Sequence, residues 1–169
     1  ETETVFTNFI NKNILPAQPV TNIVKDLIEV VKLQKQYILR LAELKLEGQN
    51  YIVVHSVRTA IVALALGIHF KLPQHKLIEL GMAAHLHEIG MIKLPPQLYL
   101  SNKILTPQEK QAITAHTVLG FKILKAANFP MTVCLAVLES HENVDGSGYP
   151  RALTDDKISP FAKIVSISS

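Results

Sequence analysis

Apolar residues recur along most of the chain at spacings of three, four or seven, which is the pattern of helices with one buried face. The first clear stripe follows Thr21 and Asn22, either of which can cap a long helix that Gly48 ends. Alternation with a period of two is nearly absent. The pattern therefore predicts an all-α fold, a bundle of several helices. The stripe consists of Val24, Leu27, Ile28, Val31, Ile38 and Leu41.

Caps and breakers divide the rest of the chain into further helices. Asn50 can cap a helix over residues 51–68, which is apolar over most of its surface and is expected in the middle of the core. Pro73 opens a segment to Leu86, and residues 106–109 have the spacing of a capping box. Pro130 and Pro160 open two later helices. The glycine-rich stretch 143–150 is typical of a loop.

Composition narrows the class of protein. With 169 residues, 48% of them apolar, the chain can bury one sizeable core. A net charge of +3 is too small to predict nucleic-acid binding. The single cysteine, Cys134, excludes a disulfide within the chain and a zinc site built on several thiolates. The longest apolar run, residues 60–68, is shorter than the roughly 20 residues of a membrane span, so we expect no span and a cytoplasmic location.

The chain divides into three parts. Residues 1–20 are polar and contain two prolines, which indicates an N-terminal lead-in or linker; residues 21–48 form a connecting helix, and residues 49–169 form the main domain. The apolar stripe within residues 21–46 could pack on a partner protein or form a homodimer. Because the chain begins with Glu1, we expect it to be part of a longer protein.

The histidines are the most informative chemistry in the sequence. Any one of them is most simply a core histidine bonded to a backbone carbonyl, and His69 and His75 are expected at the surface. Taken together, imidazole and carboxylate groups are ligands for zinc, iron or manganese, and helical bundles build metal sites from side chains on separate helices. The residues that meet this description, from four segments, are His55, His87 with the adjacent Glu88, His116 and His141.

This series resembles the HD-GYP branch of the HD phosphohydrolase superfamily, from about Gln49 to the end of the chain. Its strongest piece is the octapeptide of residues 144–151, Val-Asp-Gly-Ser-Gly-Tyr-Pro-Arg. The resemblance implies an HD-type bundle with a GYP-bearing loop, a two- or three-metal centre, and hydrolysis of cyclic di-GMP to the linear dinucleotide and sometimes to GMP. It also implies further helices after residue 169. The loop residues that it places beside the substrate are Asp145, Gly148, Tyr149, Pro150 and Arg151.

The sequence departs from the family pattern at several positions. Glu88 stands where the family has aspartate, and its extra methylene displaces the carboxylate from a bridging position. Met91 replaces a lysine, for which Lys93 is a doubtful catalytic substitute. His85 occupies an apolar position and is interpreted as a local substitution. The substituted ligand positions are Tyr51 for a glutamate, Ser140 for a histidine and Ser169 for an aspartate.

Two predictions of function follow from the resemblance and these departures. The first, which we favour, is a degenerate domain with reduced or lost hydrolysis and a signalling, ligand-binding or partner-binding role in cyclic di-GMP-related regulation. The second is an active metal-dependent phosphodiesterase. Glu88, His116 and His141 could hold one divalent metal (iron, manganese or zinc), with His55 and His87 as a remnant of the other site, or the domain binds none.

Overall fold

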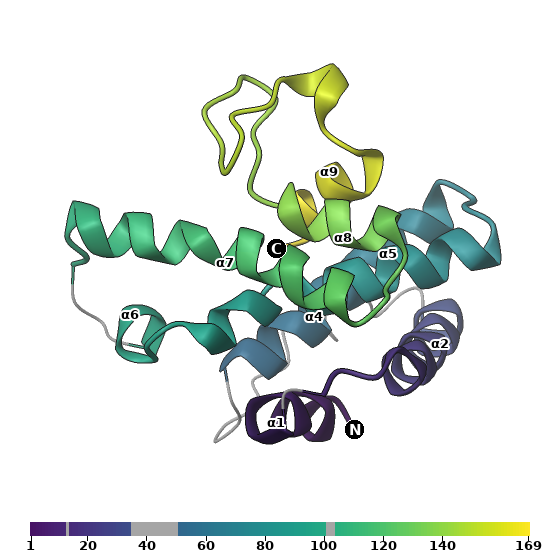
Figure 1. Ribbon diagram of the computed structural model, residues 1–169. Helices are drawn as coiled ribbons and strands as arrows, with labels where there is room; N and C mark the ends of the chain where they lie inside the picture. Colours follow the sequence, from purple (N-terminus) through teal and green to yellow (C-terminus); the bar gives the residue numbers. More distant parts are fainter. Residues whose placement is uncertain (13, 35–50, 101–103) are drawn as a thin grey trace.

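The computed structural model describes residues 1–12, 14–34, 51–100 and 104–169. Within these ranges the regular structure is helical, apart from an isolated bridge between Asp145 and Thr154, and the predicted all-α class is confirmed (Figure 1). The elements are α1 (Thr2–Lys12), α2 (Ala17–Leu33), α4 (Tyr51–His69), α5 (Gln74–Leu86), the short 3-10 helix η2 (Ile89–Lys93), α6 (Gln97–Leu100), α7 (Pro107–Ala126), α8 (Met131–Leu138), the 3-10 helix η3 (Asp155–Lys157) and α9 (Pro160–Ser168).

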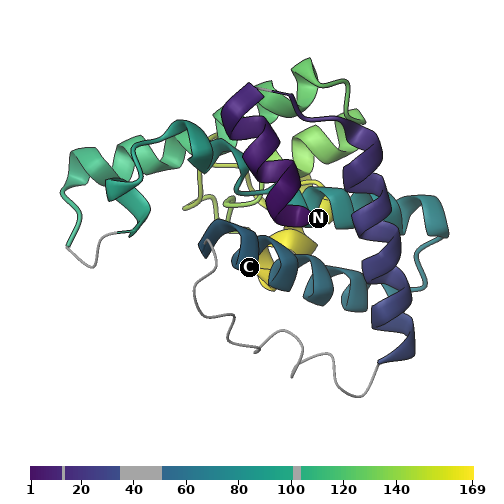
Figure 2. The same cartoon turned by 90° about the horizontal axis from the view of Figure 1, so that it is seen from below.

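Helix α4 lies in the middle of the bundle, as the sequence predicts. It packs against α1, α2, α5 and α9, and Ala60, Ala63 and Leu64 are completely buried. Seen from below, α1 and α2 lie in front of it (Figure 2). By length and composition alone, α4 is apolar enough to cross a membrane, but more than half of it is buried by the rest of the chain. Its contacts are those of a core helix.

Helix α2 begins four residues before the predicted cap. Thr21 lies inside the helix, where its hydroxyl donates a hydrogen bond to the Ala17 carbonyl over 2.8 Å, so the predicted start at Thr21 or Asn22 is wrong. Pro19 is tolerated because the first turn of a helix has amide groups without intrahelical partners. The earlier start also places Val20 on the buried stripe.

Residues 2–12, within the predicted N-terminal lead-in or linker, are helical. They form α1, whose apolar face (Val5, Phe6 and Phe9) is buried. These three residues have helical spacing, but the many threonines and asparagines around them hide the pattern. The division of the chain at residue 20 therefore has no counterpart in secondary structure, because α2 crosses it.

The second half of the predicted connecting helix, including Ile38, Leu41 and Gly48, lies outside the described residues. In the described half, Val24, Ile28 and Val31 are buried within this chain and contribute to its core. This part of the stripe is not available to a second molecule. A homodimer or partner contact through residues 21–46 stays a prediction.

The later helices confirm the predicted starts to within one residue. Thr106 and Glu109 form a complete capping box: the Glu109 amide donates to the Thr106 hydroxyl over 3.3 Å, and the Thr106 amide donates to the Glu109 carboxylate over 2.9 Å. Pro73 and Pro130 each precede the first helical residue of α5 and α8. Ser159 caps α9 by accepting a hydrogen bond from the Ala162 amide over 3.3 Å.

Candidate metal centre

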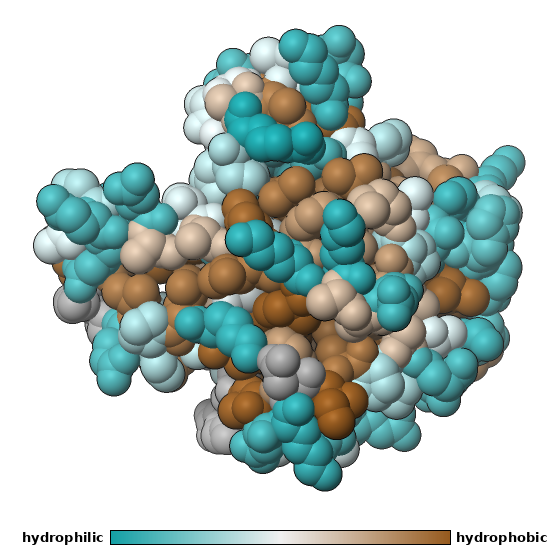
Figure 3. Space-filling view, viewed as in Figure 1, coloured by the Kyte–Doolittle hydropathy of each residue, from teal (hydrophilic) through white to brown (hydrophobic). Residues whose placement is uncertain are grey.

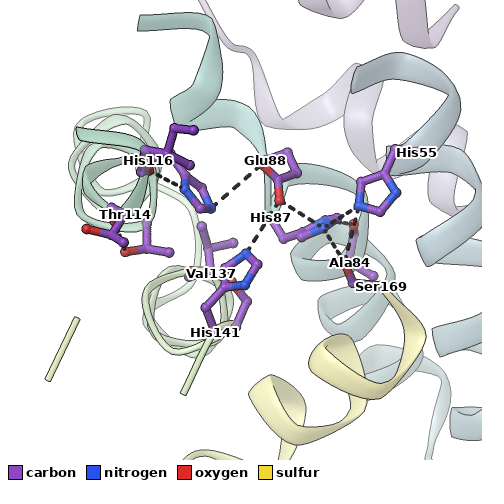
Figure 4. Close-up of polar contacts among 12 residues, drawn as sticks. His55, Ala84, His87, Glu88, Thr114, His116, Val137, His141 and Ser169 are labelled. Atoms are coloured by element: carbon purple, nitrogen blue, oxygen red, sulfur yellow. Dashed lines mark hydrogen bonds and ion pairs between the residues drawn. The ribbon is translucent and has the colours of Figure 1, made fainter. Parts of the chain in front are cut away.

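Imidazoles from different elements meet around one carboxylate (Figure 4). The ligand-bearing residues belong to α4 (His55), the end of α5 (His87), α7 (His116) and the segment after α8 (His141), and Glu88 joins α5 to η2. The predicted convergence of these five side chains is present in the structure. They form two groups, within each of which the ligand atoms lie within 4.8 Å of one another: His55, His87 and Glu88; and Glu88, His116 and His141.

A close approach between η2 and α7 brings Glu88 to His116. A Cβ atom on Gly90 would lie 1.9 Å from the carbonyl oxygen of His116, so only glycine allows the two elements to pack at this distance. The Ile-Gly step after Glu88 therefore has a structural reason. It lets a carboxylate that follows α5 face an imidazole in the middle of α7.

In the first group, two imidazoles face each other. The Nε2 atoms of His55 and His87 are 3.2 Å apart, and the Ser169 hydroxyl oxygen lies 3.2 Å from the first and 3.3 Å from the second. Ser169 thus stands beside both imidazoles, at the position where the resemblance implies an aspartate. A neutral hydroxyl is a weaker ligand for a divalent cation than a carboxylate, because it brings no charge.

In the second group, the nitrogen atoms face the carboxylate without a normal hydrogen bond to it. The Nε2 of His141 lies 3.4 Å from Glu88 Oε1, and the Nε2 of His116 lies 3.7 Å from Oε2. Two ligands held roughly 2.1 Å from one tetrahedral ion are separated by roughly 3.4 Å, so these spacings suit a shared cation. Both nitrogen atoms are buried without a hydrogen-bond partner. The residues present therefore fit a divalent metal.

Backbone carbonyls orient two of the imidazoles. His87 and His116 each direct Nδ1 at a carbonyl oxygen three residues earlier, of Ala84 and Ile113, over 2.8 Å. A carbonyl only accepts, so Nδ1 carries the proton and the Nε2 lone pair faces the centre. This arrangement is common in metal-binding histidines, whose outer nitrogen is fixed by a hydrogen bond. The sequence did not reveal these two carbonyl partners.

Burial lowers the pKa values of three of the imidazoles, those of His55, His87 and His116, and so favours their neutral forms. It lowers the pKa of His87 to about 4, against the opposing attraction of Glu88. Burial likewise lowers the pKa values of His55 and His116, again opposed by Glu88. Burial alone would raise the pKa of Glu88, but the close approach of the His141 imidazole and the other neighbouring imidazoles outweigh it and lower the value to about 2. Neutral imidazoles around an ionised carboxylate are the protonation states that metal binding needs.

The GYP-bearing loop folds back onto the second group. The ring of Tyr149 stacks on that of His141, with centroids 5.0 Å apart and planes 7° from parallel, and it meets His116 edge-on at 6.3 Å. Gly148 makes this possible, because a Cβ there would lie 2.3 Å from the Asn143 amide nitrogen. Tyr149 thus covers one side of the pair of imidazoles, whereas Asp145 is exposed and accepts hydrogen bonds from Ser147 within the loop.

Two buried glutamates that the sequence analysis did not single out hold this loop. Glu142 accepts hydrogen bonds from the amides of Arg151 and Leu153 over 2.7 and 2.8 Å. Glu139 accepts one from the Ser159 amide over 2.7 Å and forms an ion pair with the Arg151 guanidinium. The sequence contains a signal for these anchors, since acidic residues flank Ser140-His141 directly before a loop. The backbone amides of a loop need hydrogen-bond acceptors, which carboxylates can supply. Arg151, expected beside the substrate, is paired with Glu139.

Several other predicted positions do not supply ligands to the two groups. The Ser140 hydroxyl donates to the Val137 carbonyl over 3.0 Å, and Tyr51 is exposed and stacks on His55, with ring centroids 5.6 Å apart. The Lys93 ammonium lies 4.8 Å from the ring centroid of Phe9 on α1. His85 is completely buried and meets the ring of Phe6 edge-on, in agreement with a local substitution.

Together, the helical fold and the cluster of histidines around a carboxylate are those of a helical domain of HD type, with groupings of side chains that could hold a metal. The chain belongs to the HD domain family, which matches residues 27–169. The cyclic di-GMP phosphodiesterase PdeB of Borreliella burgdorferi is 37% identical over 120 residues, 71% of this chain and 32% of that protein. A cyclic di-GMP phosphodiesterase of Thermotoga maritima is 41% identical over 92 residues, 53% of this chain and 25% of that protein.

A solved structure shares the fold. The HDG"Y"P protein Bd1817 from Bdellovibrio bacteriovorus superposes with a TM-score of 0.79 at 20% identity, over 99% of this chain and 54% of that one. The predicted HD-GYP resemblance is confirmed by these relatives. The chain spans about a third or less of the length of the two curated relatives.

Proposed function

We propose that this chain is an HD-GYP-type domain that binds cyclic di-GMP at a single-metal centre and has reduced or lost hydrolytic activity. The observation that carries the proposal is the difference between the two ligand groups. The second group offers one carboxylate and two buried imidazole nitrogens that have no hydrogen-bond partner. In the first group, Ser169 stands where the resemblance implies an aspartate, and it brings only a hydroxyl. A cytoplasmic location and a role in signalling belong to the same proposal.

The chemistry of the second group supports one retained cation. Glu88, His116 and His141 would hold it, and a metal bound there supplies Lewis-acid polarisation of a phosphoryl oxygen. Glu88 lies 8% exposed and stays ionised, so it holds negative charge at the centre without a proton to lose. His55, beside Ser169, would then face the phosphodiester as a neutral hydrogen-bonding group, whereas His87, whose Nδ1 proton is donated to the Ala84 carbonyl, would present only a lone pair; neither would be part of a second strong site.

A cavity of about 290 Å³ next to the first group could take part of the ligand. Its walls include His55 and Glu88 and the rings of Tyr51 and Tyr99. Aromatic walls suit a nucleobase, because any base can stack its face on an aromatic ring. None of the described residues that line it is a lysine or an arginine, so the phosphate charge would have to be met at the metal centre.

The alternative is an active phosphodiesterase. The observation that favours it is the position of the Glu88 carboxylate, whose Oε1 lies 3.6 Å from the Nε2 of His87 and 3.4 Å from that of His141. The longer side chain therefore still reaches both groups. A bridging carboxylate is what a paired centre needs in order to clamp the attacking and leaving oxygens of a displacement.

Metal content and turnover separate the two possibilities. We expect the purified chain to hold at most one equivalent of manganese, iron or zinc by elemental analysis, and His116→Ala to remove it, with His69→Ala as a surface control. Cyclic di-GMP incubated with manganese should bind but stay intact. Two or three full equivalents of metal, or rapid hydrolysis, would establish the active phosphodiesterase instead.

A restoring triple variant tests which positions weaken the centre. Glu88→Asp, Ser140→His and Ser169→Asp together should raise the metal content towards two equivalents, because each returns a ligand that the resemblance implies. Ser166→Asp, an exposed position on α9, is the control for added charge near the C-terminus. An unchanged metal content would mean that other parts of the pocket limit binding.

A further inference from the structure

Helix α1 lies against the turn between α5 and η2, where Glu88 stands. The ring of Phe6 meets the imidazole of His85 edge-on, with ring centroids 6.0 Å apart and planes 86° apart. About one turn later, the ring of Phe9 lies under the Lys93 ammonium, which is 4.8 Å from its centroid. His85 precedes Glu88 on α5 and Lys93 follows it on η2. Helix α1 therefore contacts the chain on both sides of the shared carboxylate.

Both phenylalanine rings belong to the core. Phe6 and Phe9 are each 3% exposed, and His85 is completely buried. The two rings are three residues apart and share one face of α1, so a shift of this helix moves both contacts at once. A close-packed interior transmits such a displacement from one side chain to the next. The position of α1 is thus coupled to the position of the turn that carries Glu88.

The turn itself has little internal support. The Met91 amide donates to the Glu88 carbonyl over 2.9 Å, and the Leu94 amide donates to the Met91 carbonyl over 2.9 Å. A short 3-10 helix has poorer hydrogen-bond geometry than an α-helix, so its position depends on the elements packed against it. Helix α7 approaches the turn at Gly90, and α1 approaches it at Lys93.

The space between α1 and α7 is incompletely filled. A cavity of about 730 Å³ lies there, and the residues that line it include Phe9, Leu119 and Ile123. On the face seen in Figure 3, a hydrophobic area lies over this junction, with hydrophilic side chains at its edge. Helix α1 also lies before residues 27–169, which match the HD domain family. Because elements with fewer buried contacts open more readily, we expect α1 to move more easily than α4, which is surrounded by other helices.

We propose that α1 is a clamp on the metal centre: its docking through Phe6 and Phe9 sets the position of Glu88, and its release weakens metal binding. This inference rests on the proposed function, since it requires a cation at the second ligand group. Phe6 and Phe9 act through His85 and the η2 turn, so they are positioning residues and not ligands. In this arrangement Lys93 ties η2 to α1. Any binding event that displaces α1 lowers metal affinity by the same route.

Two measurements on the whole chain test the clamp: the Kd for manganese by calorimetric titration, and the exchange rate of the Met91 amide by NMR without added metal. Phe6→Ala should weaken manganese binding about three- to tenfold, less than the roughly 10–100-fold of changes to the direct partners of metal ligands. It should also speed exchange of the Met91 amide, because opening of the turn breaks the hydrogen bond of that amide. Phe6→Leu keeps an apolar side chain at this position and should recover most of both losses.

Leu77→Ala is the matched control for lost core packing. Leu77 is 4% exposed on the first turn of α5 and packs against Gly67, at the end of the helix away from Glu88. It should lower the melting temperature as Phe6→Ala does, but change manganese affinity and Met91 exchange less. The clamp is overturned if either quantity changes no more in Phe6→Ala than in Leu77→Ala.

Lys93→Gln provides a test that leaves the core intact, because Lys93 is exposed. It should weaken manganese binding about two- to fivefold, the size of an exposed cation–π contact. In a Phe9→Leu background its effect should be smaller, because the pair is already broken. Additive effects of the two substitutions would overturn the role assigned to Lys93. A parent chain that binds no manganese would instead overturn the proposed function, and the exchange of the Met91 amide would then decide the clamp on its own.

Discussion

Glu88 belongs to both groups of possible ligands, and its surroundings explain how a glutamate reaches both of them. The sequence analysis expected the extra methylene to displace the carboxylate from a bridging position. In the structure, Gly90 lets η2 approach α7 so closely that the longer side chain ends between the two groups. The backbone position, and not side-chain length alone, decides where the oxygens lie.

His85 should make the free energy of unfolding depend on pH. It is fully buried, and burial, with a smaller contribution from the neighbouring His87, lowers its pKa from 6.5 to about 4. The unfolded chain takes up a proton near pH 6.5 but the folded chain does not, so this contribution lowers stability as pH falls from 6.5 to 4, by up to about 3 kcal/mol. Above pH 6.5 it has no effect.

The comparison of His85→Leu with the parent chain isolates this contribution. We compare the free energy of unfolding of the variant with that of the parent chain, measured by urea unfolding at pH 7.5 and at pH 4.5. Between these two pH values, the difference should shift by about 2–3 kcal/mol in favour of the variant. His75→Leu, at an exposed position, serves as the control. An equal difference between parent and variant at the two pH values would contradict the expectation.

At the scale of elements, the loop of residues 143–159 is held by two buried carboxylates, in addition to the burial of Ile158. The two carboxylate oxygens of Glu142 accept hydrogen bonds from the amides of Arg151 and Leu153, which lie nine and eleven residues further along the chain. The stacking of Tyr149 on His141 depends on this anchorage, because the same loop carries the tyrosine. The polar anchors thus couple the loop to the metal centre.

Glu142→Gln should loosen the loop while leaving the helices folded. Replacing the charged acceptor of two amide hydrogen bonds should cost roughly 2 kcal/mol of unfolding free energy, since bonds to charged groups are worth more than neutral ones. Trypsin should then cleave after Arg151 several times faster than in the parent chain. Asp156→Asn, an exposed change in the same loop, is the control, and unchanged cleavage in both would contradict the proposed anchoring.

At the scale of the whole molecule, a metal held by Glu88, His116 and His141 would join three parts of the bundle. Glu88 joins α5 to η2, His116 is on α7 and His141 follows α8. A cation bound only by the folded chain therefore stabilises contacts among these elements at once. Each ligand lies far in sequence from most of the others, so the unfolded chain offers no comparable site.

Manganese should accordingly raise the melting temperature of the whole chain. At a free concentration of 100 times Kd, binding adds about 2.7 kcal/mol, which for a chain of this size corresponds to roughly 5–10 °C. Excess EDTA should reverse the shift, and His116→Ala should not show it. A shift of the same size in His116→Ala would mean that the metal binds elsewhere.

Local chemistry made much of the fold predictable. The capping box at Thr106, the prolines before α5 and α8 and the proline that begins α9 act within one turn of the chain, so their residue types carry the signal. Helix α1 and the true start of α2 were missed because tertiary burial of Phe6, Phe9 and Val20 outweighs a polar local composition. The described residues do not test the connecting helix beyond Leu33.

By itself, the sequence determined the helical class, the family and the set of metal-ligand candidates, because these depend on residue type and spacing. Only the tertiary structure decided which nitrogen atoms face Glu88, and that Ser169 lies beside both His55 and His87. It also decided that Phe9 contacts Lys93 and that Glu139 pairs with Arg151. The physical reason is that the direction of a side chain follows from packing between distant elements. That packing is a property of the assembled bundle rather than of any one helix.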